Sequence, residues 1–336
     1  MKLLGIDLGY NATKIVSSTG KVQFPSIVGT PDKSSFQIVG ASGFSIKHNN
    51  KHYNIGNVAA EQSRFVTRKE DREWINSDEY MVLFHAALST QFVKGPESVT
   101  VVTGLPLAYY DADKQNIKEQ FERMHHVFRD DRNVVTLNVE KCSVVPQPMG
   151  TLAHVAFDDE GNITNSTMLT GRVGIIDIGG KTTNILHALR MADIRAETES
   201  VSIGGWDVVR AMQSKVESAC PGVGYSDHEI SEAVKKMFVK YKGRVVDLSQ
   251  EVNSVLDKVT QPILSKVREL WAADGARLDQ ILISGGGAHL IGDRLKSALD
   301  HENVELVDDP VFANAMGYYK LAKWQEKSNE KTNYTK

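Results

Sequence analysis

One short pattern, Asp-x-Gly-x-x-x-Thr, occurs twice in this chain, about half the chain apart. The first copy runs from Asp7 to Thr13 and the second from Asp177 to Thr183, and a short apolar run precedes each of them. An apolar run that ends in a glycine-containing turn before apolar character resumes predicts a buried strand, a turn and a second strand. Because one copy opens each half of a 336-residue chain, we expect two domains of similar construction.

The rest of the chain alternates between strand-like and helix-like segments. Residues 99–106 form an apolar run that ends in glycine and proline, and residues 79–92 and 114–128 have helical apolar spacing on either side of it. Residues 252–271 carry one apolar face of a long helix. This alternation predicts an α/β fold. From about residue 325 the chain lacks apolar anchors, and we expect a flexible tail there.

A carboxylate at the tip of a strand, followed by a glycine turn, suits phosphate binding. The turn can direct several backbone N–H groups into one concave nest that holds phosphate oxygens. Two such nests that face each other across a cleft would grip a nucleoside triphosphate from both sides, with Asp7 and Asp177 beside its charge. Carboxylates so close to phosphates require a cation, and we expect Mg²⁺ bound largely through water.

The loop residues are the candidate nucleotide contacts, together with a later run of three glycines that precedes a predicted helix. The N-terminus of that helix favours an anion. The threonine hydroxyls can either contact phosphate or fix the turn, and both roles stay open. The candidates are Gly9, Tyr10, Asn11, Thr13 and Lys14 in the first loop, Gly179, Gly180, Lys181, Thr182 and Thr183 in the second, and Gly285, Gly286 and Gly287 in the run.

Composition and missing motifs exclude several other functions. The chain has 39 basic and 42 acidic side chains and a net charge of −3, which does not supply the positive field that direct DNA binding uses. Neither a signal-peptide pattern nor a long apolar span is present, so we expect a cytoplasmic location and no membrane contact. The ten histidines form no zinc-binding motif, and no nucleophile elbow is present.

Together with three further segments, the two copies resemble the five motifs of the actin, sugar kinase and heat-shock ATPase superfamily, in the same order. Residues 146–152 and 309–318 match its connecting motifs, and residues 283–290 match its adenosine motif. The resemblance implies two duplicated ribonuclease-H-like, actin-type domains with a nucleotide cleft between them. Domain I would comprise residues 1–150 and 308–324, with a small subdomain near 30–80, and domain II residues 151–307, with a small subdomain near 190–260, before a tail at 325–336.

Within this superfamily, three segments are most similar to the ParM/StbA plasmid-segregation actins and related archaeal actin-like proteins. They are residues 145–152 (VPQPMGTL), 202–207 (SIGGWD) and 312–318 (FANAMGY). This group implies an ATPase, or a GTPase, whose filaments depend on nucleotide and move plasmid copies through a DNA-binding centromere adaptor. The resemblance also adds Gly204 and Gly205 to the nucleotide contacts.

The same resemblance implies roles for three side chains. Asp7 would help to hold Mg²⁺, Gln147 would orient the attacking water, and Asp177 would polarise that water or bind the metal. So small a set suffices because phosphoryl hydrolysis depends chiefly on positioning and charge compensation. Lys181 and Asn184 depart from the residues usual in the group, and the purine contacts have no residue-by-residue match, so the choice between ATP and GTP is open.

Two alternatives share this fold. A small-molecule kinase, or another ATPase that does not polymerise, would carry the same loops together with an acceptor pocket or a further domain. A relative that binds nucleotide only as a scaffold would retain the loops without the hydrolytic side chains. The presence of Asp7, Gln147 and Asp177 favours hydrolysis.

Overall fold

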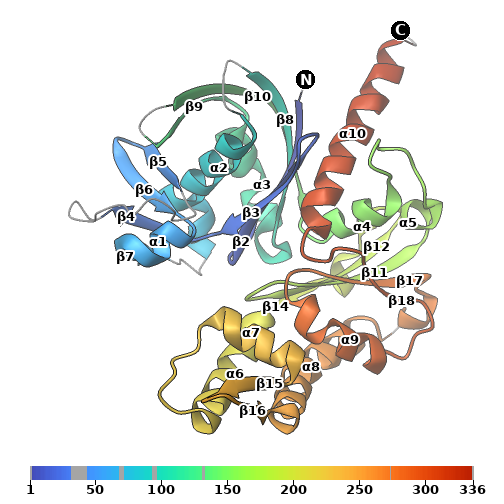
Figure 1. Ribbon diagram of the computed structural model, residues 1–336. Coiled ribbons are helices and arrows are strands. Elements are labelled where there is room, and N and C mark those ends of the chain that lie inside the picture. Colours follow the sequence, from blue (N-terminus) through green and yellow to red (C-terminus); the bar gives the residue numbers. More distant parts are fainter. Residues whose placement is uncertain are drawn as a thin grey trace. The chain divides into compact units, whose positions relative to one another are not determined.

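The computed structural model describes residues 2–31, 44–67, 72–92, 97–130, 133–272 and 274–334. Two compact units divide the chain. The first comprises Met1–Asn165 and Asn314–Lys336, and the second comprises Ser166–Ala313 (Figure 1). The chain therefore returns to the first unit through its last helix, α10 (Ala313–Tyr334).

A sheet of ten strands, counted over the described residues, forms the first unit in the order β3-β2-β1-β8-β10-β9-β5-β6-β4-β7. Strand β1 pairs antiparallel with β2 and parallel with β8, and β10 runs parallel to β8. Most residues of β1 and β8 are buried on both faces, as expected for strands that pair in parallel inside a sheet. The strands are β1 Lys2–Leu8, β2 Ala12–Ser17, β3 Gly20–Pro25, β4 Val28–Pro31, β5 Phe44–His48, β6 Lys51–Ile55, β7 Ser63–Thr67, β8 Glu97–Leu105, β9 Met124–Arg129 and β10 Asn133–Pro146.

Helix α2 lies at the centre of the first unit's core. It begins after Ser77, whose side chain accepts a hydrogen bond from the N–H of Tyr80, and most of its residues are buried. Its Phe84 ring stacks on Phe121 of α3 with centroids 3.7 Å apart. The helices of this unit are α1 Asn57–Gln62, η1 Arg72–Asn76, α2 Asp78–Gln91, α3 Leu107–Phe121, α4 Met149–Ala156 and α10.

The predicted helix at 114–128 is wrong in its second half. Helix α3 ends at Phe121, and residues 124–129 form strand β9. His125 and Val127 are buried while their neighbours are exposed, a period of two that only a strand provides.

The second unit repeats the local construction of the first. Strand β11 pairs antiparallel with β12 and parallel with β17, and Asp177 faces Asn184 across the hairpin as Asp7 faces Lys14 in the first unit. The predicted duplication of a strand, turn and strand is confirmed. The sheet has the order β13-β12-β11-β17-β18, with β14 on β12, and its strands are β11 Arg172–Ile178, β12 Thr183–Leu189, β13 Ala192–Asp193, β14 Glu199–Val201, β17 Gln280–Ser284 and β18 Val304–Leu306.

Helices cover this second sheet. Helix α8 continues through Pro262, and its buried face matches the predicted apolar stripe. Gly174 of β11 allows close packing, because a Cβ atom there would lie 2.7 Å from the Trp271 ring. The remaining elements are α5 Ser166–Thr170, η2 Arg195–Glu197, α6 Gly205–Ala219, α7 Asp227–Lys236, β15 Phe238–Tyr241, β16 Arg244–Asp247, α8 Ser249–Leu270, η3 Gly275–Arg277 and α9 Ala288–Ala298.

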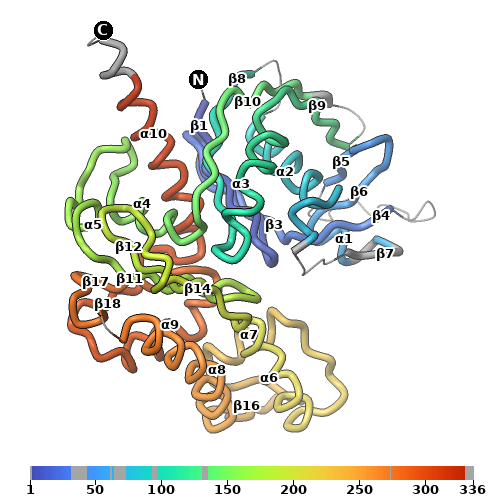
Figure 2. The backbone as a smooth tube through the Cα atoms, turned by 180° about the vertical axis from the view of Figure 1, so that it is seen from behind, coloured from blue at the N-terminus to red at the C-terminus, as the bar shows by residue number. Residues whose placement is uncertain are grey.

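Helix α10 continues through residue 334, and the flexibility that we expected at 325–336 stays a prediction. Its first turns pack on β1, where a Cβ atom at Gly5 would overlap the carbonyl oxygen of Ala315, and both views place this helix beside β1 (Figures 1 and 2). None of the helices in the described ranges is both long and apolar enough to cross a membrane.

Candidate functional site

Asp7, at the end of β1, is the centre of a polar cluster in the first unit. The residue is 2% exposed. Lys14 Nζ lies 2.9 Å from its Oδ2, and Gln147 Nε2 donates a hydrogen bond of 2.9 Å to its Oδ1. Lys14 reaches Asp7 because the two residues are partners across the β1–β2 hairpin. The structure therefore brings Gln147 to the hairpin pair of Asp7 and Lys14, from which it is distant in the sequence.

Gln147 is held in place by its backbone. It occupies the turn between β10 and α4, where its N–H donates to Leu105 O at 2.8 Å and its carbonyl accepts from Tyr318 Oη at 3.0 Å. Gly104 permits this arrangement, because a Cβ atom there would overlap the Tyr318 hydroxyl and lie 3.0 Å from Gln147 Cα. The fixed backbone leaves the side-chain amide aimed at Asp7.

The two connecting segments meet in the first unit. Asn314 Oδ1 accepts hydrogen bonds from the N–H and the hydroxyl of Thr151, at 3.1 and 2.9 Å. Gly150 and Gly317 lie backbone to backbone, since a Cβ atom on Gly317 would overlap Gly150 O. The glycines in VPQPMGTL and FANAMGY thus allow α4 and α10 to pack closely behind Gln147.

The threonines that end the two loops fix the turns. The Thr13 hydroxyl is buried and lies 3.0 Å from Ser26 Oγ, and the Thr183 hydroxyl donates to Ile203 O at 2.7 Å. Gly9 and Gly179 are also equivalent, since a Cβ atom on either would lie about 3 Å from the carbonyl oxygen three residues later. Tight turns of this kind leave backbone N–H groups for phosphate.

The remaining residues of the two loops are partly exposed. The Tyr10 ring stacks on Trp74 with centroids 4.7 Å apart, which gives it a packing role. Asn11 is exposed, and Lys181 and Thr182 are half-buried. The backbone at Gly180 also takes part in loop packing, because its carbonyl accepts from Trp206 N at 2.8 Å.

Three loops converge in the second unit around Asp177, which is 3% exposed. Gly205 N donates to Gly179 O at 3.0 Å, and Gly287 N donates to Ile178 O at 2.7 Å. A Cβ atom on Gly204 would lie 2.6 Å from Gly179 O, and one on Gly287 would lie 3.0 Å from Gly205 N. The glycines are needed because the backbones of the three loops touch.

The glycine run brings the start of α9 to the same place. Gly285 has a φ of +91°, and a Cβ atom there would overlap Asp177 Oδ1. In contrast, a Cβ atom on Gly286 would have no neighbour within 4 Å among the described residues. The Gly286 backbone therefore borders open space, beside the N-terminus of α9, where an anion is stabilised.

Helix α7 contributes residues that the sequence did not identify. Its Ser231 Oγ lies 3.3 Å from Nε2 of His289, in the first turn of α9. Burial, and then the Lys235 charge, lower the pKa of His289. The start of α7 was readable from Ser226 and Glu229, which form a capping box. Its packing against α9 is a tertiary contact with no local pattern.

Asp7 in the first unit and Asp177 in the second are each a carboxylate of the kind that can bind Mg²⁺ together with water and phosphate oxygens. The described residues contain no group of three or more His, Cys, Asp or Glu side chains that could hold a metal ion by themselves. Mg²⁺ does not need such a group, because it usually keeps several waters and takes one or two carboxylates. Asp7 and Asp177 stand at strand tips beside glycine turns, as such binding requires.

These features define a class: a two-domain α/β protein in which each domain carries an Asp-tipped hairpin beside glycine turns, as in actin. Residues 5–150 match the family described as actin like proteins N terminal domain, and residues 175–297 match archaeal actin homologue MreB-like, C-terminal. Over each half of the chain the matching model is one of actin-like proteins, and the predicted actin-type fold is confirmed.

Individual relatives and solved structures align with almost the whole of this chain. An archaeal actin homolog of Thermoplasma volcanium is 26% identical over 95% of this chain and 98% of the relative. A crystal structure of an archaeal actin homolog from selenomethionine data has a TM-score of 0.83 at 23% identity, and the match covers 98% of this chain and 100% of that structure. A crystal structure of an archaeal actin homolog in complex with ADP has a TM-score of 0.78 at 21% identity, and the match covers 96% of this chain and 99% of that structure. A 15-stranded ParM filament from Clostridium botulinum has a TM-score of 0.75 at 24% identity, covering 96% of this chain and 99% of its own.

Proposed function

We propose that this protein is a polymerising actin-like nucleoside triphosphatase, which hydrolyses ATP or GTP and forms filaments that depend on the nucleotide. The observation that carries the proposal is the hydrogen bond from Gln147 to Asp7, with Lys14 on the second carboxylate oxygen. An amide group beside a charge-compensated carboxylate is suited to orienting a water molecule, and phosphoryl hydrolysis asks for little more than positioning and charge compensation.

In the proposed mechanism each residue has a limited task. The backbones of the two glycine turns bind phosphate oxygens, and Lys14 and Lys181 add positive charge. Gln147 holds the attacking water through its amide, which is too weak a base to take the proton itself. Asp177, in the second unit, polarises that water. Mg²⁺, bound near Asp7 and Asp177 when nucleotide is present, would supply charge compensation to the phosphates. The cleft that would join the two sets of residues stays a prediction.

The nucleoside part of the ligand would lie against the second unit. The open space at Gly286, together with the contact between Ser231 and His289, supports a pocket formed by α7 and the start of α9. An archaeal actin homolog of the same fold has been crystallised in complex with ADP. Whether this chain prefers adenine or guanine depends on side chains of this face.

The filament part of the proposal rests on the ParM relatives, of which one has been solved as a filament. By the same likeness we propose plasmid DNA segregation in the cytoplasm as the cellular role. The net charge of −3 favours contact with DNA through a centromere adaptor rather than directly.

The test measures assembly and hydrolysis together. Purified protein with Mg²⁺ and ATP, or with GTP, should scatter more light above a critical concentration, and phosphate release should follow. Protein without nucleotide, and protein with nucleotide and excess EDTA, are the controls. Hydrolysis without polymer at any concentration would reject the filament role. Transfer of phosphate to a small metabolite would instead establish a kinase, and nucleotide binding without turnover would establish a scaffold.

A further inference from the structure

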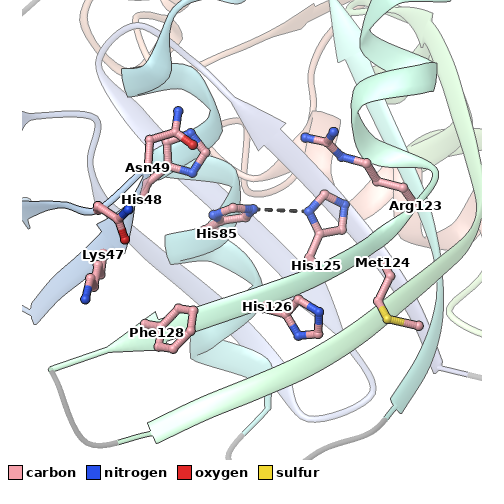
Figure 3. Close-up of a pocket in the computed structure, with 10 residues that line it drawn as sticks. Lys47, His48, Asn49, His85, Arg123, Met124, His125, His126 and Phe128 are labelled. Carbon is pink, nitrogen blue, oxygen red and sulfur yellow. Dashed lines mark hydrogen bonds between the residues drawn. The ribbon is translucent and has the colours of Figure 1, made fainter.

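A pocket of about 370 Å³ lies in the first unit, away from the Asp7 cluster, and no step of the proposed mechanism uses it. It is bordered by the end of β5, helix α2 and strand β9 (Figure 3). Its lining includes Lys47, His48, His85, Arg123, His126 and Phe128, and no carboxylate among the described residues lines it. A concave volume of this size is at the lower end of the range for small-molecule sites.

Two paired histidines form the floor of the pocket. His125 Nε2 lies 2.8 Å from Phe121 O, which can only accept, so this nitrogen carries the proton and Nδ1 accepts from His85 Nε2 at 3.1 Å (Figure 3). Burial lowers the pKa of His85, and burial lowers the pKa of His125 to about 4. The floor is therefore uncharged at neutral pH.

The rim of the pocket is positively charged. Among the described residues, neither Lys47 nor Arg123 has an ion-pair partner, and Figure 3 shows the Arg123 side chain extending toward the histidines. Asp78 lies outside the lining and is already engaged, since Asn49 Nδ2 donates to it at 3.2 Å and His48 Nε2 lies 3.8 Å away. Within the described part of the chain, Lys47 and Arg123 therefore give the pocket two positive charges that no ion pair engages.

One wall of the pocket is apolar and exposed. Met124 and Phe128 project on the same face of β9, with 58% and 39% of their surfaces exposed. The β5–β6 turn opposite is fixed by Asn49 and Asn50, both with left-handed φ, at 47° and 59°. This wall suits a planar or apolar body, whereas the rim suits an anion.

We propose that this pocket binds a small phosphomonoester, with the phosphate dianion at Arg123 and Lys47 and an apolar or aromatic body against Met124 and Phe128. Two positive charges beside an uncharged floor match a dianion better than a single carboxylate. The planar guanidinium of arginine also binds phosphate through two parallel hydrogen bonds. An acidic segment of another protein fits less well, because the charges lie in a small concave pocket rather than along an extended face.

The test uses methyl-labelled methionine and NMR, with the Met124 signal assigned by its loss in Met124→Leu. Phenyl phosphate carries both the dianion and the aromatic body, inorganic phosphate only the dianion, and benzoate the body with a single charge. We expect phenyl phosphate to shift the Met124 signal in a saturable way and to bind more tightly than either fragment. The signal reports on this pocket alone, so phosphate binding at the nucleotide loops does not enter the measurement.

Arg123→Ala should weaken phenyl phosphate binding about tenfold or more, as expected for the loss of a charge-assisted pair. Lys141→Ala, which removes an exposed charge of β10 outside the pocket, should leave affinity unchanged. Circular dichroism should show that both variants fold. The proposal fails if phenyl phosphate does not shift the Met124 signal up to about 10 mM, if benzoate binds as well as phenyl phosphate, or if Arg123→Ala binds as tightly as the parent.

Discussion

Gln147 and Asp7 are separated by most of the first unit's sequence, yet Nε2 of the glutamine lies 2.9 Å from Oδ1 of the aspartate. The glutamine comes from the turn after β10 and the aspartate from the tip of β1, and strand β8 lies between β1 and β10 in the sheet. This hydrogen bond joins the first Asp-x-Gly loop to the segment VPQPMGTL.

Replacing Gln147 by Ala should slow hydrolysis about 10- to 100-fold while nucleotide affinity changes little, because the amide positions water and holds no phosphate. Phosphate release and binding of a fluorescent nucleotide would measure the two effects. Gln91→Ala is the matched control, since Gln91 accepts from Ser17 and Thr19 at the far end of α2. Unchanged hydrolysis in Gln147→Ala would remove this residue from the mechanism.

Replacing Lys14 by Met should lower the free energy of unfolding by about 3 kcal/mol, because Asp7 would keep a buried charge without its partner. Denaturant titration of both proteins would measure the difference. Lys2→Met provides the comparison: Lys2 pairs with Glu97 at the same 2.9 Å, but its side chain is 50% exposed, and the expected loss is below about 1 kcal/mol. An equal loss of unfolding free energy in the two variants would show that the buried pair of Lys14 and Asp7 stabilises the protein no more than the exposed pair does.

The neighbouring glycines Gly286 and Gly287 should respond differently to alanine. Gly286→Ala should fold with a free energy of unfolding within about 1 kcal/mol of the parent, because its methyl group would meet open space. Nucleotide affinity should fall, since the methyl group would occupy that space. Gly287→Ala should be clearly destabilised, because its Cβ atom would lie 2.7 Å from Ile178 Cγ2 and 2.8 Å from Gly179 O. Thermal melting and nucleotide titration would separate these effects, and a destabilised Gly286→Ala would count against the open space.

Stability should fall as pH is lowered from 6.5 toward 4, because the His85–His125 pair is buried in its neutral form. The pKa of His125 is lowered from 6.5 in the unfolded chain to about 4, and that of His85 is also lowered. The unfolded chain therefore binds more protons in this window, and stability is lost as pH falls through it. For His125 alone the loss should reach about 2 kcal/mol by pH 5.

Denaturant titration at several pH values would measure this loss. His125→Gln is the control, because a glutamine amide can donate to Phe121 O without titrating. Its stability should depend less on pH between 6.5 and 5. The same dependence in both proteins would show that other groups cause the loss.

Local sequence pattern was sufficient to predict many of the helices and strands of this protein. The two Asp-x-Gly-x-x-x-Thr copies predict their own hairpins, because an apolar run, a glycine and a second apolar run are a local signal for two strands joined by a tight turn. The apolar stripe of α8 likewise defines a buried helix face. Residues 114–128 were misassigned because Ile117, Phe121, Met124 and Phe128 fit a helical spacing. Only the pairing of β9 with β10 and β5 separates the two possibilities.

Tertiary structure alone decided which residues meet. The hydroxyls of Thr13 and Thr183 contact Ser26 and Ile203. The sequence alone did not distinguish this role from a contact with phosphate. The contact of α7 with α9 at Ser231 and His289, and the pocket between β5, α2 and β9, join segments with no shared local signal. The physical reason is that a side chain's chemistry depends on neighbours brought by packing, whereas sequence pattern records only the neighbours along the chain.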